Sequence, residues 1–253
     1  MHRIETINFF LMNILKTIWN QFGQRCPRLA TEIQYLRRYR NYEPDLWAVP
    51  QFCDRSGVSI DVGVNMGIYS RWMAKHSERV ESFECNTALH SHLKQFLPRN
   101  ANLQPYALSD KSGSVSFRVD PKNTGIGTID AANLLDQNPG IGEIVEQHVE
   151  ARRLDEFGFK DVTFMKIDVE GHELSVLRGG HDLIQRCRPA LLIELEERHH
   201  PGCLTAVPNW LAEFGYTPFI YENGLGMQEV TGDLQDHAES KYNFWFLTCD
   251  AKR

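Results

Sequence analysis

The sequence lacks the signatures of several common functional classes. None of its six cysteines belongs to a C-x-x-C pair, which argues against zinc-ribbon and thioredoxin-type chemistry. The net charge of -6 gives no electrostatic support for a nucleic-acid partner, so none is expected. No apolar run approaches the roughly 20 residues that a membrane-spanning helix requires. Because no secretory signal is visible, we expect reduced thiols and a cytoplasmic location.

The N-terminal segment carries an amphipathic helical pattern. Apolar side chains recur at helical spacing over residues 4–22. We therefore predict N-terminal helices over residues 1–50, ahead of a larger α/β domain over residues 51–253. Two interpretations of the apolar face stay open. It packs against protein, in its own domain or in a homodimer, or it makes peripheral membrane contact. Few lysines lie on the polar face, and this favours protein packing.

From about residue 56 onward, short apolar runs alternate with helical patterns. The expected strands cover residues 59–62, 79–84, 103–108, 114–119, 162–168, 189–195, 217–221 and 242–247, and the expected helices residues 69–75, 87–97, 173–178 and 207–214. This alternation predicts a mostly parallel sheet with helices on both faces. The last two strands lack a long helix between them, so we expect them to close the sheet as an antiparallel pair.

Residues 120–147 are rich in glycine, asparagine, aspartate and proline. They predict a long loop with at most a short helix. An insertion after the third strand lies on the ligand side of such a sheet, so we expect this segment to contribute to substrate binding. A mobile surface loop without a gating role is the alternative.

A glycine turn follows the first expected strand, in the stretch IDVGVNMGIYS over residues 60–70. Its spacing, from Gly63 to Gly67, is G-x-x-x-G, whereas a dinucleotide-binding turn requires G-x-G-x-x-G. Asp61 would repel a pyrophosphate but suits a ligand with an ammonium group and hydroxyls. S-adenosylmethionine carries both, together with a carboxylate that helix N-terminal amides can bind. The turn therefore favours S-adenosylmethionine over NAD.

Acidic residues follow the next two expected strands. Glu84 comes about 20 residues after Gly63, where nucleotide-binding sheets place the acid that binds ribose hydroxyls. Asp110 follows the third strand, where it could accept a hydrogen bond from an adenine amino group. Each acid alone is a weak signal, but their order along successive strand ends is more specific.

The chain resembles the FkbM family of S-adenosylmethionine-dependent methyltransferases. The matching stretches are DVGVNMGIYS (61–70), SFECN (82–86), NLQPYALSDKSG (102–113), MKIDVEGHELSVLRGG (165–180) and RPALLIELEERHH (188–200). The resemblance implies a Rossmann-like class I methyltransferase fold, whose seven-stranded, mostly parallel sheet has a reversed last strand. It also implies methyl transfer to a hydroxyl of a sugar, glycolipid or related metabolite, which leaves S-adenosylhomocysteine. Cys85 departs from the family pattern, which has proline there.

The motifs that carry the resemblance also supply the candidate cofactor contacts. These are Asp61, Gly63, Asn65, Gly67, Tyr69, Ser70, Glu84, Ser109, Asp110 and Asp168.

Methyl transfer to an alcohol requires a group that removes its proton. His199 and His172 are the first choices, since histidine titrates near neutral pH. Asp168 would orient the substrate, the histidine or a metal. Each has a structural alternative: Asp168 as a helix cap, and the histidines as exposed side chains.

Further carboxylates follow the neighbouring strands. Glu170 follows Asp168, and Glu194 and Glu196 come before His199 and His200. We include Glu194 among the catalytic candidates. Asp168, Glu194 and His199 are ligand types that Mg²⁺ accepts, but their spacing specifies no geometry, so a required metal is not favoured.

Two rival functions remain open at this point. An NAD-dependent oxidoreductase would use a similar sheet, although the missing third glycine and Asp61 argue against it. A non-catalytic interaction module would keep the fold and assemble through its N-terminal helix. The retained acids and the DVEGHE stretch argue against that alternative.

Overall fold

The computed structural model describes residues 43–133, 135 and 142–249. The chain divides into two compact units, Met1–Pro44 and Asp45–Arg253, and the described residues fall almost wholly in the second. The predicted N-terminal helices, and their contact with a membrane or a second copy, lie outside the described residues. In the described part of the chain, no helix combines the length and the apolar character needed to cross a bilayer.

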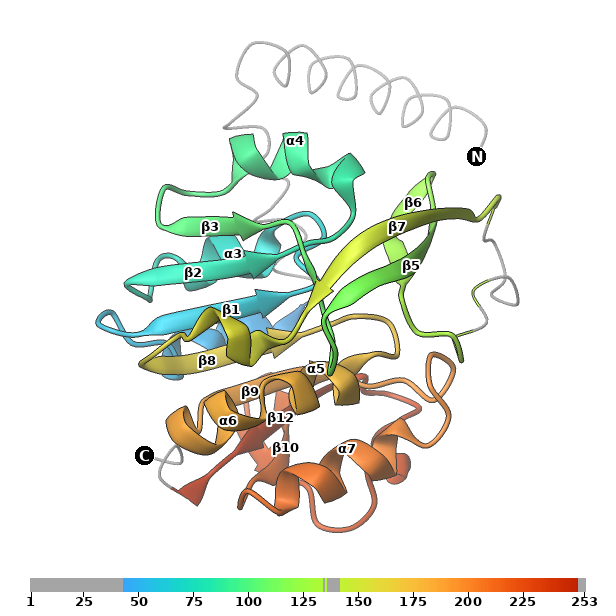
Figure 1. Ribbon diagram of the computed structural model, residues 1–253. Helices are drawn as coiled ribbons and strands as arrows, with labels where there is room; N and C mark the ends of the chain where they lie inside the picture. The colour runs from blue at the N-terminus through green and yellow to red at the C-terminus, as the bar shows by residue number, and fades with distance from the viewer. Residues whose placement is uncertain (1–42, 134, 136–141, 250–253) are drawn as a thin grey trace, which may run out of the picture. The chain divides into compact units, whose positions relative to one another are not determined.

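The main sheet of the described residues has eight strands in the order β11-β10-β12-β9-β8-β1-β2-β3 (Figure 1). The strands are β1 (Val58–Val62), β2 (Arg79–Phe83), β3 (Ala101–Gln104), β8 (Val162–Ile167), β9 (Ala190–Glu194), β10 (Thr217–Glu222), β11 (Gly226–Glu229) and β12 (Asn243–Leu247). Strands β3, β2, β1, β8 and β9 run parallel, whereas β12 is antiparallel to both of its neighbours. The mostly parallel sheet with a reversed last strand is thus confirmed. The predicted strand number is low by one, because β11 forms an added hairpin with β10.

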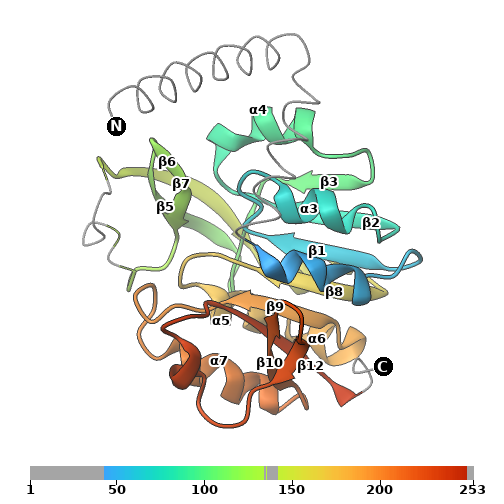
Figure 2. The same ribbon diagram turned by 180° about the vertical axis from the view of Figure 1, so that it is seen from behind.

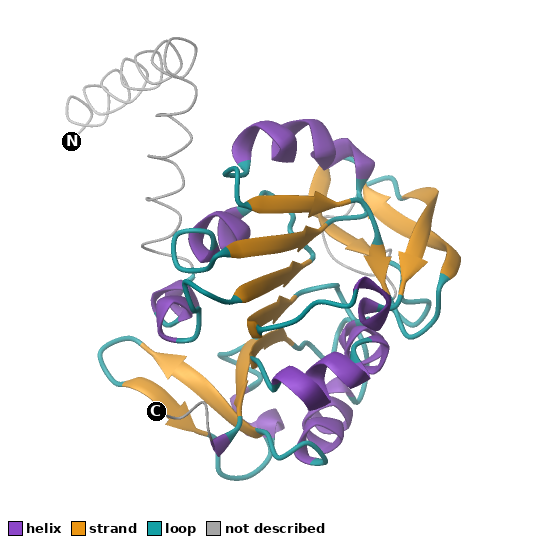
Figure 3. Ribbon diagram, turned by 60° about the vertical axis from the view of Figure 1, so that its left-hand side comes forward, coloured by secondary structure: helices purple, strands orange, loops and turns teal. Residues whose placement is uncertain are grey.

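Helices cover both faces of this sheet (Figures 2 and 3). They are α3 (Ile68–Met73), α4 (Thr87–Phe96), α5 (Glu173–Gly179), α6 (His181–Cys187) and α7 (Cys203–Ala212), with short 3₁₀ turns η1 (Pro44–Trp47), η2 (Val49–Gln51), η4 (Leu154–Phe157) and η5 (Leu234–His237). Local chemistry sets the ends of α4, since Asn86 caps its start by accepting from the amide of Ala88 and Pro98 follows its end. Helix α6 was not predicted.

A second, four-stranded sheet stands beside the carboxyl ends of the main strands (Figure 1). Its order in the described residues is β4-β7-β5-β6, with β4 at Ala107–Leu108, β5 at Gly113–Asp120, β6 at Asn123–Thr128 and β7 at Val145–Arg152. Because proline lacks an amide donor, Pro105 separates β3 from β4, so the strand predicted over 103–108 is divided between the two sheets.

The small sheet corrects the prediction of a long loop over residues 120–147. Strand β6 and the start of β7 occupy both ends of that segment. Strand β6 was not predicted because its sequence contains two glycines, which are uncommon in strands. Gly127 fits there because a Cβ would lie 2.5 Å from the ring of Phe117. Strand β7 was hidden because half of its residues are exposed and most of its side chains are polar.

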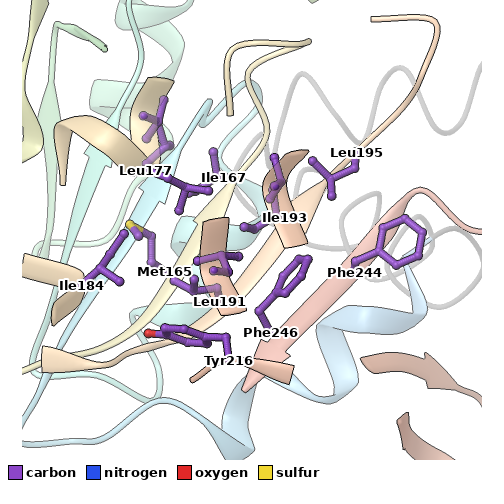
Figure 4. Packing of buried hydrophobic residues seen from close by; sticks show 14 of the residues in the cluster. Met165, Ile167, Leu177, Ile184, Leu191, Ile193, Leu195, Tyr216, Phe244 and Phe246 are labelled. Atoms are coloured by element: carbon purple, nitrogen blue, oxygen red, sulfur yellow. The ribbon is translucent and has the colours of Figure 1, made fainter. Parts of the chain in front are cut away.

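The main apolar core lies between strands β8, β9 and β12 and the helices α5, α6 and α7. Figure 4 shows Met165 of β8, Leu191 of β9 and Phe246 of β12 packed together with Ile184 of α6. Strands β9 and β12 are apolar over most of their length, as expected for strands that are buried on both faces. Each fully buried side chain of this size contributes about 1.5–3 kcal/mol.

A polar contact ties the start of the described domain to the centre of the sheet. The indole nitrogen of Trp245 donates to Asp45 Oδ1 at 2.6 Å, and both residues are buried. Trp245 also stacks on Phe164 and makes a tilted ring contact with Phe52. The carboxylate thus satisfies an N–H group that has no access to water.

We predict that Asp45→Ala destabilises the protein by about 2 kcal/mol, because it leaves a buried donor unpaired. For a domain of this size the melting temperature should fall by roughly 4–8 °C in a thermal melt followed by circular dichroism. Asp45→Asn retains an acceptor oxygen and should lose less than half as much. Equal losses in the two variants would show that this hydrogen bond is not the cause.

Candidate active site

A cleft of about 610 Å³, open to solvent, lies between the carboxyl ends of the main strands and the small sheet. It is lined by Val62, Gly63, Asn65, Phe83, Glu84, Cys85, Tyr106, Ala107, Leu108, Phe117, Gly127, Ile129, Asp168, Val169 and Glu170. Strand β1 has β2 on one side and β8 on the other, so the chain order reverses at this point. Open α/β sheets bind ligands at such a reversal.

Gly63 and Asn65 of the glycine turn line the cleft, whereas Gly67 lies outside its lining. Gly63 has a φ of 80°, and a Cβ there would overlap the carbonyl oxygen of Asp168. Gly67 has a φ of 83° and begins α3 against Leu93 and Phe96. Both positions therefore need glycine, for backbone conformation and for space. Asn65, with a φ of 49°, presents its amide to Glu84.

Glu84 lines the cleft at the end of β2. Its two carboxylate oxygens each accept a backbone amide at 2.8 Å, from Asn65 and from Asn86. Burial raises the pKa of Glu84 to about 7, against the effect of these two hydrogen bonds. Each carboxylate oxygen has a second lone pair, so Glu84 can also accept hydroxyl groups of a ligand.

Asp61 lies behind the cleft wall. It is 1% exposed, and its Oδ2 accepts from the hydroxyl of Ser70 at 2.5 Å. Within the described residues its Oδ1 has no hydrogen-bond partner. Burial raises the pKa of Asp61 to about 6, while the positive charge of Lys166 opposes that rise. Ser70 and Tyr69, also predicted as cofactor contacts, are buried beside Asp61 and Lys166 respectively.

Lys166 is a buried cation that sequence reasoning did not single out. Its Nζ lies 2.7 Å from Asp168 Oδ2 and 4.7 Å from the centre of the Tyr69 ring. Burial alone would lower its pKa, but Asp168 and Asp61 outweigh burial and raise it. Lys166 therefore stays charged and holds the Asp168 side chain at the edge of the cleft.

Ser109, Asp110 and His172 meet beside the cleft and do not line it. His172 Nε2 lies 2.9 Å from Ser109 Oγ, and its Nδ1 lies 3.5 Å from Asp130 Oδ2. The same Asp130 oxygen is 3.1 Å from His200 Nδ1. The residues that line the cleft after β3 are instead Tyr106, Ala107 and Leu108.

The turn after β8 carries the acidic residues of the DVEGHE stretch. Glu170 has a φ of 55°, a left-handed conformation that costs a non-glycine residue about 1–2 kcal/mol. Its Oε2 lies 2.8 Å from Nε2 of His199, which is 4% exposed. Burial disfavours the charged imidazole, but Glu170 and Glu196 outweigh burial and raise the pKa of His199. No spacing in the sequence indicates that Glu170 and His199 form a pair.

Glu194 ends β9 in a strongly acidic setting. Burial and the charge of Asp168 raise the pKa of Glu194 to about 10. It is therefore protonated at neutral pH and is poorly suited to remove a proton there. In the described part of the chain, no three histidine, cysteine or acidic side chains are placed to hold a metal ion, so Asp168, Glu194 and His199 do not form such a group.

Glu173, the last residue of DVEGHE, supports the turn from within the protein. It is 3% exposed, and its Oε1 accepts the amides of Gly171 at 2.9 Å and Val169 at 3.3 Å. Burial raises the pKa of Glu173 to about 7, although these amide bonds act in the opposite direction. In an unfolded chain glutamate titrates near pH 4.3.

These values predict how stability depends on pH. The folded state binds the Glu173 proton more tightly than the unfolded state, so this contribution is present at low pH and is lost as pH rises through about 7. Glu173→Gln keeps the acceptor oxygen without the charge. Its melting temperature relative to wild type should therefore be a few degrees higher at pH 8 than at pH 5, measured by calorimetry. A relative decrease at pH 8 would mean that the fold favours the ionised carboxylate.

A family comparison matches the chain to the Methyltransferase FkbM domain over residues 61–218, well over half of the 253 residues. The matched interval includes the glycine turn, the whole small sheet and the acidic turn after β8. No curated protein matches the chain at a significant level.

Solved methyltransferase structures resemble this chain to different degrees. The methyltransferase FkbM from Methylobacillus flagellatus KT has a TM-score of 0.51 and 16% identity, covering 93% of this chain and 60% of that one. The chain thus spans about three fifths of that relative's length. A precorrin-6y C5,15-methyltransferase from Geobacter metallireducens GS-15 gives 0.40 at 13% identity, covering 79% of this chain and 83% of that one. TrmK from M. capricolum, in complex with S-adenosylhomocysteine, has a TM-score of 0.36 and 11% identity, covering 79% of this chain and 65% of that one.

The sheet order and the first of these structures agree on a class I methyltransferase fold. Because the family model spans most of the described domain as well, the chain belongs to the FkbM methyltransferase domain family.

Proposed function

We propose that the chain is an S-adenosylmethionine-dependent O-methyltransferase that acts on a hydroxyl of a sugar, glycolipid or related metabolite. The observation that carries this proposal is the cleft at the reversal of the sheet, where Glu84 stands at the end of β2 and a glycine turn follows β1. Family membership supports methyl transfer. The identity of the acceptor as a hydroxyl group is an additional part of the proposal, and the acidic groups of the cleft support it.

The residues of the cleft fit S-adenosylmethionine chemically. Glu84 can accept from ribose hydroxyls, since its bonds to backbone amides leave lone pairs on both oxygens. Asp61, with one buried oxygen that has no partner among the described residues, adds negative charge behind the glycine turn. Tyr106, Phe117 and Ile129 give the cleft apolar walls suited to a purine ring.

When bound, S-adenosylmethionine supplies an electrophilic methyl group. The chain must then position an alcohol and take its proton. Asp168 lines the cleft and is held by Lys166 at 2.7 Å, so it can orient an acceptor hydroxyl through a hydrogen bond. Strands β5 and β6 contribute Phe117 and Gly127 to the side of the cleft away from the main sheet.

Calorimetric titration tests the cofactor. Wild-type protein should bind S-adenosylmethionine with micromolar affinity and show no binding of NAD⁺. Glu84→Gln should weaken S-adenosylmethionine binding about tenfold, since one charge-assisted acceptor is lost. Asp61→Asn should also weaken it.

Glu81→Gln is the matched control, because Glu81 is a buried acid of the same strand that contacts Arg79, Asn102 and Gln104 and does not line the cleft. Unchanged affinity in both site variants would contradict the site assignment. Failure of the wild type to bind S-adenosylmethionine would overturn the proposed function.

A transfer assay tests the role of Asp168. The protein is incubated with S-adenosylmethionine and a panel of methyl glycosides, and release of S-adenosylhomocysteine is followed. Asp168→Asn should lower the rate at least 100-fold, or about 2.7 kcal/mol, while the affinity for S-adenosylmethionine stays within threefold. A normal rate in this variant would show that Asp168 only supports the turn.

A further inference from the structure

The backbone around Glu170 is held by three separate elements. Thr128 Oγ1 and Asn133 Nδ2 both donate to the carbonyl oxygen of Glu170, at 2.8 and 2.7 Å. Thr128 ends strand β6 of the small sheet, and Asn133 is fully buried. From the other side, Glu173 of α5 accepts the amides of Val169 and Gly171. Four hydrogen bonds thus hold the backbone on either side of Glu170, whose φ is 55°.

Gly171 lets the strand-end turn after β9 approach this backbone. A Cβ on Gly171 would lie 2.8 Å from the carbonyl oxygen of His199, so only glycine permits the approach. The imidazole of His199 can therefore reach Glu170 Oε2 at 2.8 Å. The Glu170 side chain is 14% exposed, and the residue lines the cleft together with Asp168 and Gly63.

The two histidines expected as bases are less well placed. His172 lies between Ser109 and Asp130, and His199 is 4% exposed behind Glu170. Neither lines the cleft, whereas Glu170 does. A strained backbone position that is held from several sides is typical of a catalytic residue.

We propose that Glu170 is the catalytic base that removes the proton from the acceptor hydroxyl, and that His199 is its positioning residue. This inference rests on the proposed function. The O–H bond of the acceptor breaks, its electron pair stays on the acceptor oxygen, and the proton bonds to a carboxylate oxygen of Glu170. His199 fixes the orientation of the carboxylate and favours its ionised form, which burial opposes.

Binding measurements without an acceptor give the first test. S-adenosylmethionine carries a sulfonium charge that S-adenosylhomocysteine lacks. A carboxylate that faces the reacting methyl group therefore favours binding of S-adenosylmethionine over S-adenosylhomocysteine. Calorimetry on Glu170→Gln should show S-adenosylmethionine binding weakened about fivefold and S-adenosylhomocysteine binding within twofold of wild type.

Glu196→Gln is the control, because Glu196 is also near His199, at 3.9 Å, but does not line the cleft. It should leave both affinities unchanged. If Glu170→Gln keeps the wild-type ratio of the two affinities, the proposal is wrong. If wild type binds neither ligand, the proposed function fails and this inference fails with it. An unchanged ratio in the variant, with normal binding by wild type, contradicts this inference alone.

The pH dependence of methyl transfer gives the second test, with any methyl glycoside that the wild type accepts. Glu170→Gln should lower kcat at least 100-fold without a change in the acceptor KM, and it should remove the acidic limb of the profile. His199→Gln should shift that limb to higher pH, because the charge that favours ionised Glu170 is lost. A wild-type kcat for Glu170→Gln, or an unshifted limb for His199→Gln, would overturn the corresponding role.

Discussion

The cleft depends on one close contact between two backbones. Gly63 follows β1 and Asp168 follows β8, and the absence of a side chain at Gly63 lets the carbonyl of Asp168 occupy that space. The amide of Asp168 completes the junction by donating to the carbonyl of Val62 at 3.0 Å. Because the two strand ends are fixed side by side, groups from both turns face a common space. Any side chain at Gly63 would separate them.

The same junction concentrates charge. Lys166 and Asp61 are buried beneath it and Asp168 lies at its edge. Burial of Lys166 and Asp61 is tolerable only because opposite charges compensate one another. The compensation is incomplete, since the pKa of Asp61 is raised to about 6 and that of Glu84 to about 7. Acids outnumber cations in this part of the cleft. A ligand that brings positive charge and hydroxyl donors would therefore supply what the protein lacks there.

The sequence predicted the parts of this arrangement that follow from local pattern. Alternating apolar runs placed the central strands, and Gly63, Glu84 and Asp168 were found at strand ends that do meet. It failed where three-dimensional packing decides. Tyr69 and Ser70 share a motif with Gly63, but the first turn of α3 directs them behind the cleft. The pairing of Glu170 with His199 joins two turns whose proximity no local spacing specifies.

The sequence predicted strand β5 of the small sheet but not β6 or β7, and this sheet borders the cleft on one side. It contributes Phe117 and Ile129 to the cleft wall, and Thr128 to the turn that carries Glu170. Gly127 lies between these residues in the chain and packs on Phe117, so a shift of β6 would move the wall and the turn together. Residues that form the cleft wall are therefore linked to the backbone of Glu170 through strand β6. Substitutions in this sheet that reshape the wall must also preserve the Thr128 contact if the turn is to keep its conformation.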